Sequence, residues 1–186
     1  MSNLSIPQAL AQADLLVDRA TIDTAIGRMA AEIAADYQGE VPVFITILNG
    51  ALPFAGQLAL ELGARGQDVQ FDYMHATRYR GETSGGELVW KHRPTSALFG
   101  RRVILADDIL DEGLTLQAVR QWCLEQGATD VRIAALTVKQ HDRAIEGVRA
   151  DYTGVTVPDR YVFGFGMDVG ERLRNIPAIY AMKEAK

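Results

Sequence analysis

The spacing of apolar side chains predicts two helices in the first 40 residues. Residues 5–8, Ser-Ile-Pro-Gln, have the form of a capping box with proline near the helix start, and predict a helix to about residue 18. A second helix is predicted from near Thr21 to Gly39, because its apolar residues recur at intervals of three and four positions. These residues are Ile22, Ile26, Met29, Ile33 and Tyr37.

From residue 43 onward the pattern changes to short apolar runs that are typical of buried strands. Residues 43–48, Val-Phe-Ile-Thr-Ile-Leu, are rich in β-branched side chains, and both faces of the predicted strand are mostly apolar. Further strands are predicted at residues 69–75, 88–91, 103–106, 131–138, 155–157, 161–163 and 178–182. Helices are predicted at residues 53–62 and 114–126. Strands alternating with helices of this length predict βαβ units, and therefore an α/β fold with a parallel sheet.

Composition narrows the class of protein. The chain has 186 residues, 48% of them hydrophobic, which is enough for one domain with a buried core. The 19 basic and 24 acidic residues give a net charge of −5, which argues against a nucleic-acid partner. Cys123 is the single cysteine, so an internal disulfide is impossible and we expect a buried structural thiol. The pattern lacks a signal peptide and a membrane span, which predicts a cytoplasmic protein with no membrane partner.

Acidic residues directly follow one of the buried strands. Asp107 and Asp108 are adjacent, and Asp111 follows three residues later. Carboxylates in this position suit sugar hydroxyls or a divalent cation. Residues 112–115, Glu-Gly-Leu-Thr, then open a helix, and the backbone N–H groups of such a glycine turn attract an anion. The plain alternative is an acidic surface turn that caps the helix, whereas a phosphate cradle beside carboxylates predicts a sugar phosphate as ligand.

Residues 103–115, Val-Ile-Leu-Ala-Asp-Asp-Ile-Leu-Asp-Glu-Gly-Leu-Thr, resemble the phosphoribosyl-diphosphate-binding signature of the type I phosphoribosyltransferases. The aspartate at position 111 resembles the hypoxanthine-guanine branch. Further segments match in chain order: residues 48–50 resemble the first pyrophosphate loop, 75–80 the flexible catalytic loop, 136–139 the strand with the base-recognition lysine, and 157–168 the purine-binding hood. The resemblance covers about residues 40–180.

This resemblance implies the type I phosphoribosyltransferase fold, with a mainly parallel sheet flanked by helices. The whole of residues 1–186 would form a single domain, with its core at about 20–160 and a small hood built from about 1–19 and 161–186. It also implies a purine-salvage enzyme that converts hypoxanthine or guanine and phosphoribosyl diphosphate to IMP or GMP and pyrophosphate. Mg²⁺ is the implied cofactor, and a homodimer or homotetramer is the implied assembly.

The resemblance assigns most of its roles to the segment that carries the signature. Asp111 takes the position of the general acid/base that faces N7 of the purine. Asp107 and Asp108 contact the ribose hydroxyls, directly or through magnesium. The 5-phosphate lies along Asp111, Glu112, Gly113, Leu114 and Thr115. Lys139 donates to the 6-oxygen of the base, which disfavours adenine because its 6-amino group is itself a donor.

The hood and the loops supply the remaining implied contacts. Tyr161 stacks on the purine, Val162 bonds it through its backbone, and Asp168 holds a second Mg²⁺. Arg174 contacts the pyrophosphate, as does the loop at Asn49 and Gly50, where many relatives carry Lys or Arg in place of Asn49. Arg78 and Tyr79 stand where the family usually has a Ser-Tyr pair, in a loop at 77–88 that is expected to close over the site. We expect Arg78 to stabilise the leaving group.

Three other interpretations remain open at this stage. The base could be xanthine, or, against the presence of Lys139, adenine. The chain could be a regulator of the same fold that binds RNA or DNA, although such a protein needs a basic face. It could also be a homologue that binds without catalysis, although every expected carboxylate is present. The histidines, His75, His92 and His141, lack metal-ligand spacing, and we assign none of them a catalytic role.

Overall fold

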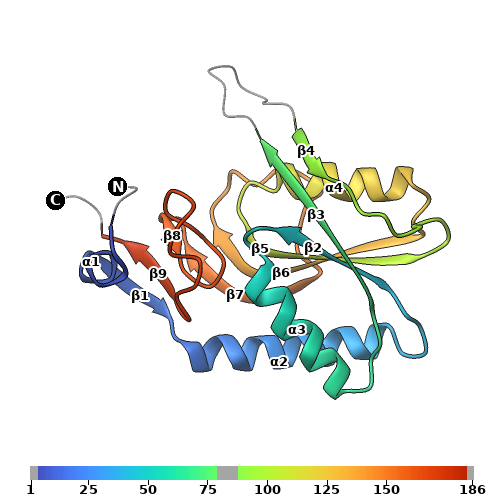
Figure 1. Cartoon of the computed structure of the whole chain (residues 1–186), viewed down its shortest axis with the longest axis horizontal. Coiled ribbons are helices and arrows are strands. Elements are labelled where there is room, and N and C mark those ends of the chain that lie inside the picture. Colours follow the sequence, from blue (N-terminus) through green and yellow to red (C-terminus); the bar gives the residue numbers. More distant parts are fainter. Residues whose placement is uncertain (1–3, 79–87, 184–186) are drawn as a thin grey trace.

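The computed structural model describes residues 4–78 and 88–183, which form two β-sheets and four helices (Figure 1). The helices are α1 (Ile6–Ala11), α2 (Arg19–Asp36), α3 (Leu52–Ala64) and α4 (Leu114–Glu125). The strands are β1 (Ala13–Val17), β2 (Val43–Leu48), β3 (Gln70–Arg78), β4 (Leu88–His92), β5 (Arg102–Leu110), β6 (Asp130–Gln140), β7 (Tyr152–Pro158), β8 (Val162–Phe163) and β9 (Ile179–Met182). The predicted α/β class is therefore confirmed.

The larger sheet has the strand order β4-β3-β2-β5-β6-β7. All neighbours in it are parallel except β3 and β4, which pair antiparallel. The chain leaves β2 through α3 toward one edge, and leaves β5 through α4 toward the other edge. Because such crossovers are right-handed, the two helices cover opposite faces (Figure 1). The strand order therefore reverses between β2 and β5, and this is where open α/β sheets bind ligands.

Helices on both faces explain why β2 is a continuous apolar run. Phe44 packs with α2 and α3, while Val43 and Ile45 pack with α4 on the opposite face. A strand buried on both sides has no solvent face on which polar residues could alternate. Cys123 lies in the α4 core, where burial raises the pKa of its thiol to about 12. The thiol is therefore inert and structural, as the sequence predicts.

A second sheet, β1-β9-β8, joins the two ends of the chain. This corrects the prediction of one helix from residue 6 to about residue 18, because the helix ends at Ala11 and residues 13–17 form a strand. The strand is stabilised by antiparallel pairing with β9, about 165 residues away in the sequence, so its local pattern does not reveal it. Arg160 also joins the sheet, donating to Asp14 at 2.6 Å and to the Met182 carbonyl at 2.8 Å. That these segments and the core make a single domain stays a prediction.

Strand β5 is longer than the sequence indicates. The prediction ended it at Ala106 and placed residues 107–113 in a polar turn, but β5 continues to Leu110. The reason is that β6 still pairs with β5 as far as the pair Leu110 and Val138.

The predicted lid at 77–88 starts within β3 and ends within β4, and residues 79–87 lie outside the described part of the chain. Within the described residues, no helix is long and apolar enough to cross a membrane.

Candidate active site

The candidate site lies at the point where β2 and β5 separate. The two strands pair from Val43 with Val103 as far as Thr46 with Ala106. Asp107 and Asp108 come immediately after this last pair, at the carboxyl ends of the parallel strands. They therefore occupy the crevice at the reversal of strand order, where the fold leaves the backbone of two strands open to a ligand.

Asp108 lies in a very close contact with two glycines. A Cβ atom on Gly50, in the loop after β2, would lie 2.1 Å from Asp108 Oδ2. A Cβ atom on Gly166, in the loop after β8, would lie 2.0 Å from the Gly50 carbonyl oxygen. Gly166 also has a φ of 107°, which L side chains rarely adopt. Only glycine at both positions lets the three segments meet, and this brings loops from distant parts of the chain into one site.

The acidic pair carries an electrostatic strain that a cation would relieve. Asp108 is buried and Asp107 half-buried, and the Asp107 carboxylate accepts a hydrogen bond from the Asp108 amide at 3.0 Å. Burial and the neighbouring Asp108 carboxylate raise the pKa of Asp107 well above its usual range, and burial also raises the pKa of Asp108. A bound divalent cation would favour the ionised form of both carboxylates, and carboxylate oxygens are ligands that such a cation prefers.

The turn from β5 into α4 has the geometry that an anion cradle requires. Gly113 is the N-cap of α4 and has a φ of 86°, the left-handed conformation that glycine adopts at little cost. Residues 114 and 115 open the first turn of the helix, where backbone N–H groups and the helix dipole favour an anion. The Glu112 carbonyl accepts a hydrogen bond from the Ile145 amide at 3.0 Å, which ties the turn to the loop after β6.

Asp111 is held by side chains from the end of β6. Its Oδ2 accepts a hydrogen bond from Lys139 Nζ at 2.7 Å, and its Oδ1 lies 2.7 Å from His141 Nε2. Burial raises the pKa of Asp111, but the hydrogen bonds from Lys139 and His141 outweigh it, so the net pKa lies below the usual value. Asp111 is therefore ionised at neutral pH. The structure brings Asp111 and Lys139 together, and it adds His141, to which the sequence assigned no catalytic role.

A second carboxylate and an arginine complete this cluster. Arg143 forms a bidentate ion pair with Asp159, which lowers the Asp159 pKa to about 2. Ligand atoms of Asp111, His141 and Asp159 all lie within 4.8 Å of one another. Lys139 Nζ and the Arg143 guanidinium already neutralise these carboxylates, with Lys139 3.8 Å from Asp159. We therefore read the cluster as an ion-pair network rather than as a metal site.

The hood residues lie around the loop that contains Gly166. Arg174 donates to the Gly166 carbonyl at 2.6 Å and pairs with Asp168 at 2.7 Å. The Tyr161 hydroxyl donates to the Asp168 carbonyl at 3.1 Å, and its side chain is 57% exposed, so its ring is not part of the core. Val162 is buried in β8, where it pairs with β9. Tyr161, Asp168 and Arg174 thus share one loop system beside Asp108.

The remaining predicted contacts to the pyrophosphate are assigned to segments at the ends of β2 and β3. Asn49 is exposed, next to a cis Leu48–Asn49 peptide bond. Arg78 ends β3, and Tyr79 lies outside the described residues.

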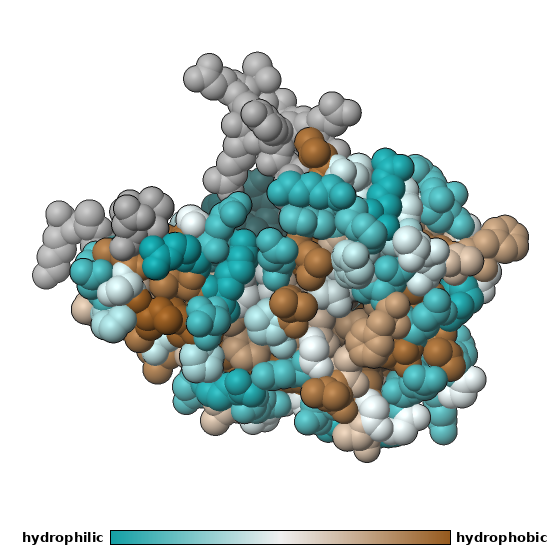
Figure 2. Space-filling model, viewed as in Figure 1, coloured by the Kyte–Doolittle hydropathy of each residue, from teal (hydrophilic) through white to brown (hydrophobic). Residues whose placement is uncertain are grey.

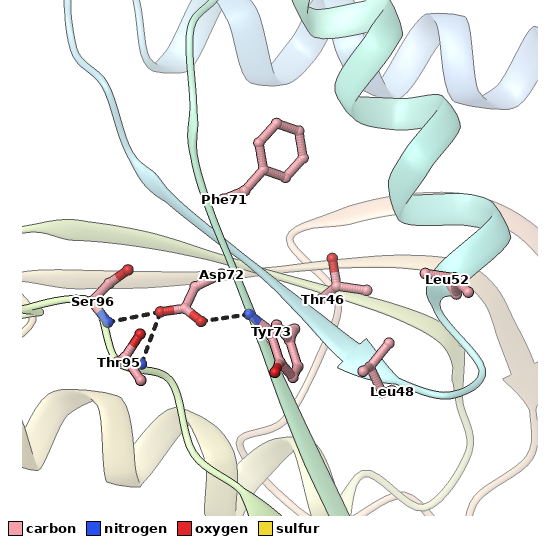
Figure 3. A pocket seen from close by; sticks show the side chains of 8 residues that line it. All are labelled: Thr46, Leu48, Leu52, Phe71, Asp72, Tyr73, Thr95 and Ser96. Atoms are coloured by element: carbon pink, nitrogen blue, oxygen red, sulfur yellow. Dashed lines mark hydrogen bonds between the residues drawn. The ribbon is translucent and has the colours of Figure 1, made fainter.

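A separate open groove of about 510 Å³ contains none of the expected site residues. Phe71 and Tyr73 of β3 line it together with Leu48 and Leu52, while Asp72 turns to the Thr95 and Ser96 amides (Figure 3).

Comparison with known proteins agrees with this geometry. The family model described as phosphoribosyl transferase domain matches residues 14–172. The hypoxanthine-guanine phosphoribosyltransferase of Streptococcus pneumoniae is 35% identical over 171 residues, covering 91% of this chain and 93% of the relative. The enzyme of the same name from Bacillus subtilis is 31% identical over 172 residues, covering 92% and 93%. A solved hypoxanthine phosphoribosyltransferase from Staphylococcus aureus has a TM-score of 0.86 at 25% identity and covers 94% of both chains.

The fold and the crevice at its switch point thus define a phosphoribosyltransferase, which confirms the predicted fold family. Since relatives above 30% identity span nine-tenths of both chains, this chain belongs to the hypoxanthine-guanine phosphoribosyltransferase family.

The contact at Gly166 predicts a large effect of a single methyl group. Gly166→Ala should lower the free energy of unfolding by roughly 2 to 4 kcal/mol, because it combines backbone strain with a collision against Gly50. Gly63→Ala is the matched control, since a Cβ there meets nothing within 4 Å and Gly63 lies within α3. Urea denaturation should show no loss, or a small gain, for the control. Equal stabilities of the two variants would contradict the close approach.

The raised pKa of Asp107 predicts that its charge destabilises the fold. Asp107→Asn should increase the free energy of unfolding at pH 7, measured by urea denaturation. Because the folded-state pKa is raised, the native protein binds the proton more tightly, and stability falls as pH rises above the unfolded value of about 3.9. The advantage of the variant should therefore vanish below about pH 4.

Added Mg²⁺ should stabilise the parent protein more than Asp107→Asn. Asp142→Asn, at an exposed position in the loop after β6, is the control and should behave like the parent. A lower stability of Asp107→Asn at pH 7 would show that the carboxylate is not under electrostatic strain.

Proposed function

We propose that the chain transfers the phosphoribosyl group of phosphoribosyl diphosphate to hypoxanthine or guanine, as a purine-salvage pentosyltransferase. The observation that carries this proposal is the pair formed by Lys139 and Asp111, with 2.7 Å between Nζ and Oδ2, beside the anion cradle at the start of α4. Relatives named for this activity cover nine-tenths of the chain, which supports the same reading.

A 6-oxopurine is complementary to this pair. Its O6 accepts hydrogen bonds and lies next to N7 on one edge of the base. In the free protein Lys139 donates to Asp111, and a base that enters between them gives each a new partner: O6 accepts from Lys139, and the N7 proton is shared with Asp111. Adenine presents a donor at position 6, so it would leave the ammonium of Lys139 unpaired in a site where Lys139 is only 13% exposed. The base is therefore an oxopurine.

Asp111 is ionised, which is the state that a general base requires. An ionised carboxylate accepts the N7 proton while N9 attacks the anomeric carbon of the ribose and the bond to pyrophosphate breaks. The carbon passes through an oxocarbenium-like state, which the carboxylate beside the base also stabilises by its charge. The 5-phosphate sits on the cradle at residues 111–115, and Asp107 and Asp108 hold the ribose hydroxyls.

Asp107, Asp108 and Asp168 would hold Mg²⁺, which supplies positive charge to the departing pyrophosphate. Their oxygen donors suit this ion, and the raised pKa of Asp107 favours a cation over an empty acidic pair. Arg174, already paired with Asp168, contributes a fixed positive charge on the same side. Gly50 and Asn49 add backbone contacts to the pyrophosphate, and we retain the proposed contribution of Arg78 and Tyr79 from the loop at 77–88.

Tyr161 and Val162 complete the base subsite. The Tyr161 hydroxyl is fixed on the Asp168 carbonyl, which holds this exposed residue in the hood, and we assign its ring to stacking on the purine. Val162 supports the base through its backbone. The reaction uses no nucleic acid or membrane, and we keep the prediction that the protein is cytoplasmic.

A product assay with phosphoribosyl diphosphate and Mg²⁺ tests the function. Hypoxanthine and guanine should be converted to nucleoside monophosphates, and adenine should not. Asp111→Asn should lower kcat by about 10²- to 10⁴-fold, because general-base assistance is lost. Xanthine, run alongside, decides how strictly position 2 of the base is read.

Glu146→Gln, at an exposed position in the loop after β6, is the control and should retain the parent kcat. Conversion of adenine but not of 6-oxopurines would contradict the role of Lys139. If the parent binds phosphoribosyl diphosphate but converts no base, the enzymatic function is wrong and a regulatory protein of this fold remains.

We further propose that the protein forms a homodimer or homotetramer through the outer face of α3 and β3. Leu52, Gly56 and Leu60 follow each other at intervals of four residues along the helix side opposite the core, with Leu52 63% and Leu60 77% exposed. Phe71 and Tyr73 lie exposed on β3 and share a groove with Leu52. Figure 2 shows hydrophobic side chains among the hydrophilic ones on this side of the molecule. A helix that is apolar on both sides is typical of an element buried by a partner.

Leu60→Glu should dissociate this assembly, because it places a charge in an apolar interface. Sedimentation velocity should show the parent as a dimer or tetramer and the variant shifted toward monomer by at least about tenfold in dissociation constant. Leu124→Glu, on α4 at the opposite face of the sheet, is the control and should sediment like the parent. An assembly that survives Leu60→Glu but not Leu124→Glu would place the interface on the α4 side.

A further inference from the structure

His141 is enclosed beside Asp111 and has no role in the reaction described above. It follows directly after β6, and only 4% of its side chain is exposed. Its imidazole is held at both ends. The Arg143 backbone N–H points at Nδ1 at 3.1 Å, and Nε2 lies 2.7 Å from Asp111 Oδ1. A side chain this buried with both nitrogens engaged has a fixed orientation.

The contact with Arg143 determines where the imidazole carries its proton. A backbone N–H can only donate, so Nδ1 must accept and is unprotonated. The neutral ring therefore carries its proton on Nε2, and Nε2 donates to Asp111 Oδ1. The hydrogen bond is thus directed, and it leaves Asp111 Oδ2 as the oxygen that faces Lys139.

Other charged groups around Asp111 do not duplicate this contact. Lys139 lies on Oδ2, and the Arg143 guanidinium reaches Oδ1 only at 3.5 Å. That guanidinium is already committed to the bidentate pair with Asp159, and lies 3.8 Å from Glu112. Among the described residues that face the carboxylate, His141 makes the short contact with Oδ1.

We propose that His141 is a positioning residue that holds the Asp111 carboxylate in the orientation for proton transfer while Lys139 is engaged by the base. This inference rests on the proposed function. When O6 of a purine accepts the hydrogen bond from Lys139, Asp111 Oδ2 loses its donor. The directed bond from His141 then keeps Oδ1 fixed, so that Oδ2 points at N7. Without it the carboxylate is free to rotate.

The test compares His141→Ala with His141→Gln in steady-state kinetics across pH. His141→Ala should lower kcat for hypoxanthine by about tenfold, with the KM of both substrates changed less than about twofold. The acid limb of its kcat/KM profile should move to higher pH, because the ionised Asp111 has lost a hydrogen-bond donor. His141→Gln should restore most of kcat and return the acid limb, since its amide N–H can reach the position of Nε2.

Asp142→Ala, the exposed neighbour of His141, is the matched control and should match the parent in rate and pH profile. An unchanged kcat and acid limb in His141→Ala would overturn the proposal. The proposal would also be overturned if His141→Ala and His141→Gln both lost rate and thermal stability while the acid limb stayed in place. That result would indicate a structural role alone.

A spectroscopic measurement on the parent does not depend on turnover. The ¹⁵N shifts of the His141 ring should report protonated Nε2 and unprotonated Nδ1 at neutral pH. The opposite tautomer would overturn the proposal even if the enzyme is active. If the tautomer is as expected but no base is converted by the parent, the proposed function fails instead, and the positioning role fails with it.

Discussion

The structure depends on the close approach of Gly50, Asp108 and Gly166. The two glycines come from different loops and Asp108 comes from strand β5, and a side-chain carbon on either glycine would lie about 2 Å from an oxygen of its neighbour. The contact forces the loop after β2 and the loop after β8 against the end of β5. It therefore joins the small β1-β9-β8 sheet, which holds the ends of the chain, to the larger sheet.

The charges of the site follow from that junction. Asp107 and Asp108 are left in a crevice where burial raises their pKa values, whereas Asp111 lies among cations and hydrogen-bond donors that lower its pKa. Carboxylates only a few residues apart thus have opposite environments. In the proposed reaction, the first environment favours a cation beside the sugar and pyrophosphate, and the second favours an ionised base beside the purine. This division is what transfer of a phosphoribosyl group to a base requires of one short segment.

The local sequence predicted much of this arrangement. The helix at α2, the strands β2 and β6, and the turn at Gly113 follow from apolar spacing and glycine placement, and the motif at residues 103–115 indicated the ligand chemistry. Strand β1 was missed because its pairing with β9 is a long-range contact that residues 13–17 do not encode locally. His141 was missed because neither its spacing nor its neighbours suggest a role. Only the fold places it against Asp111, and the one sequence signal was its position two residues after Lys139.

A crystal structure with IMP and Mg²⁺ would show whether one site at the switch point holds the phosphate and recognises the base. We expect the phosphate on the backbone of residues 111–115 and the base against Tyr161. We also expect the ion pair between Lys139 and Asp111 to open, with Lys139 on O6 and Asp111 facing N7. A nucleotide bound elsewhere, or bound here with the Lys139–Asp111 pair intact and O6 on another donor, would show that this assignment of the site is wrong.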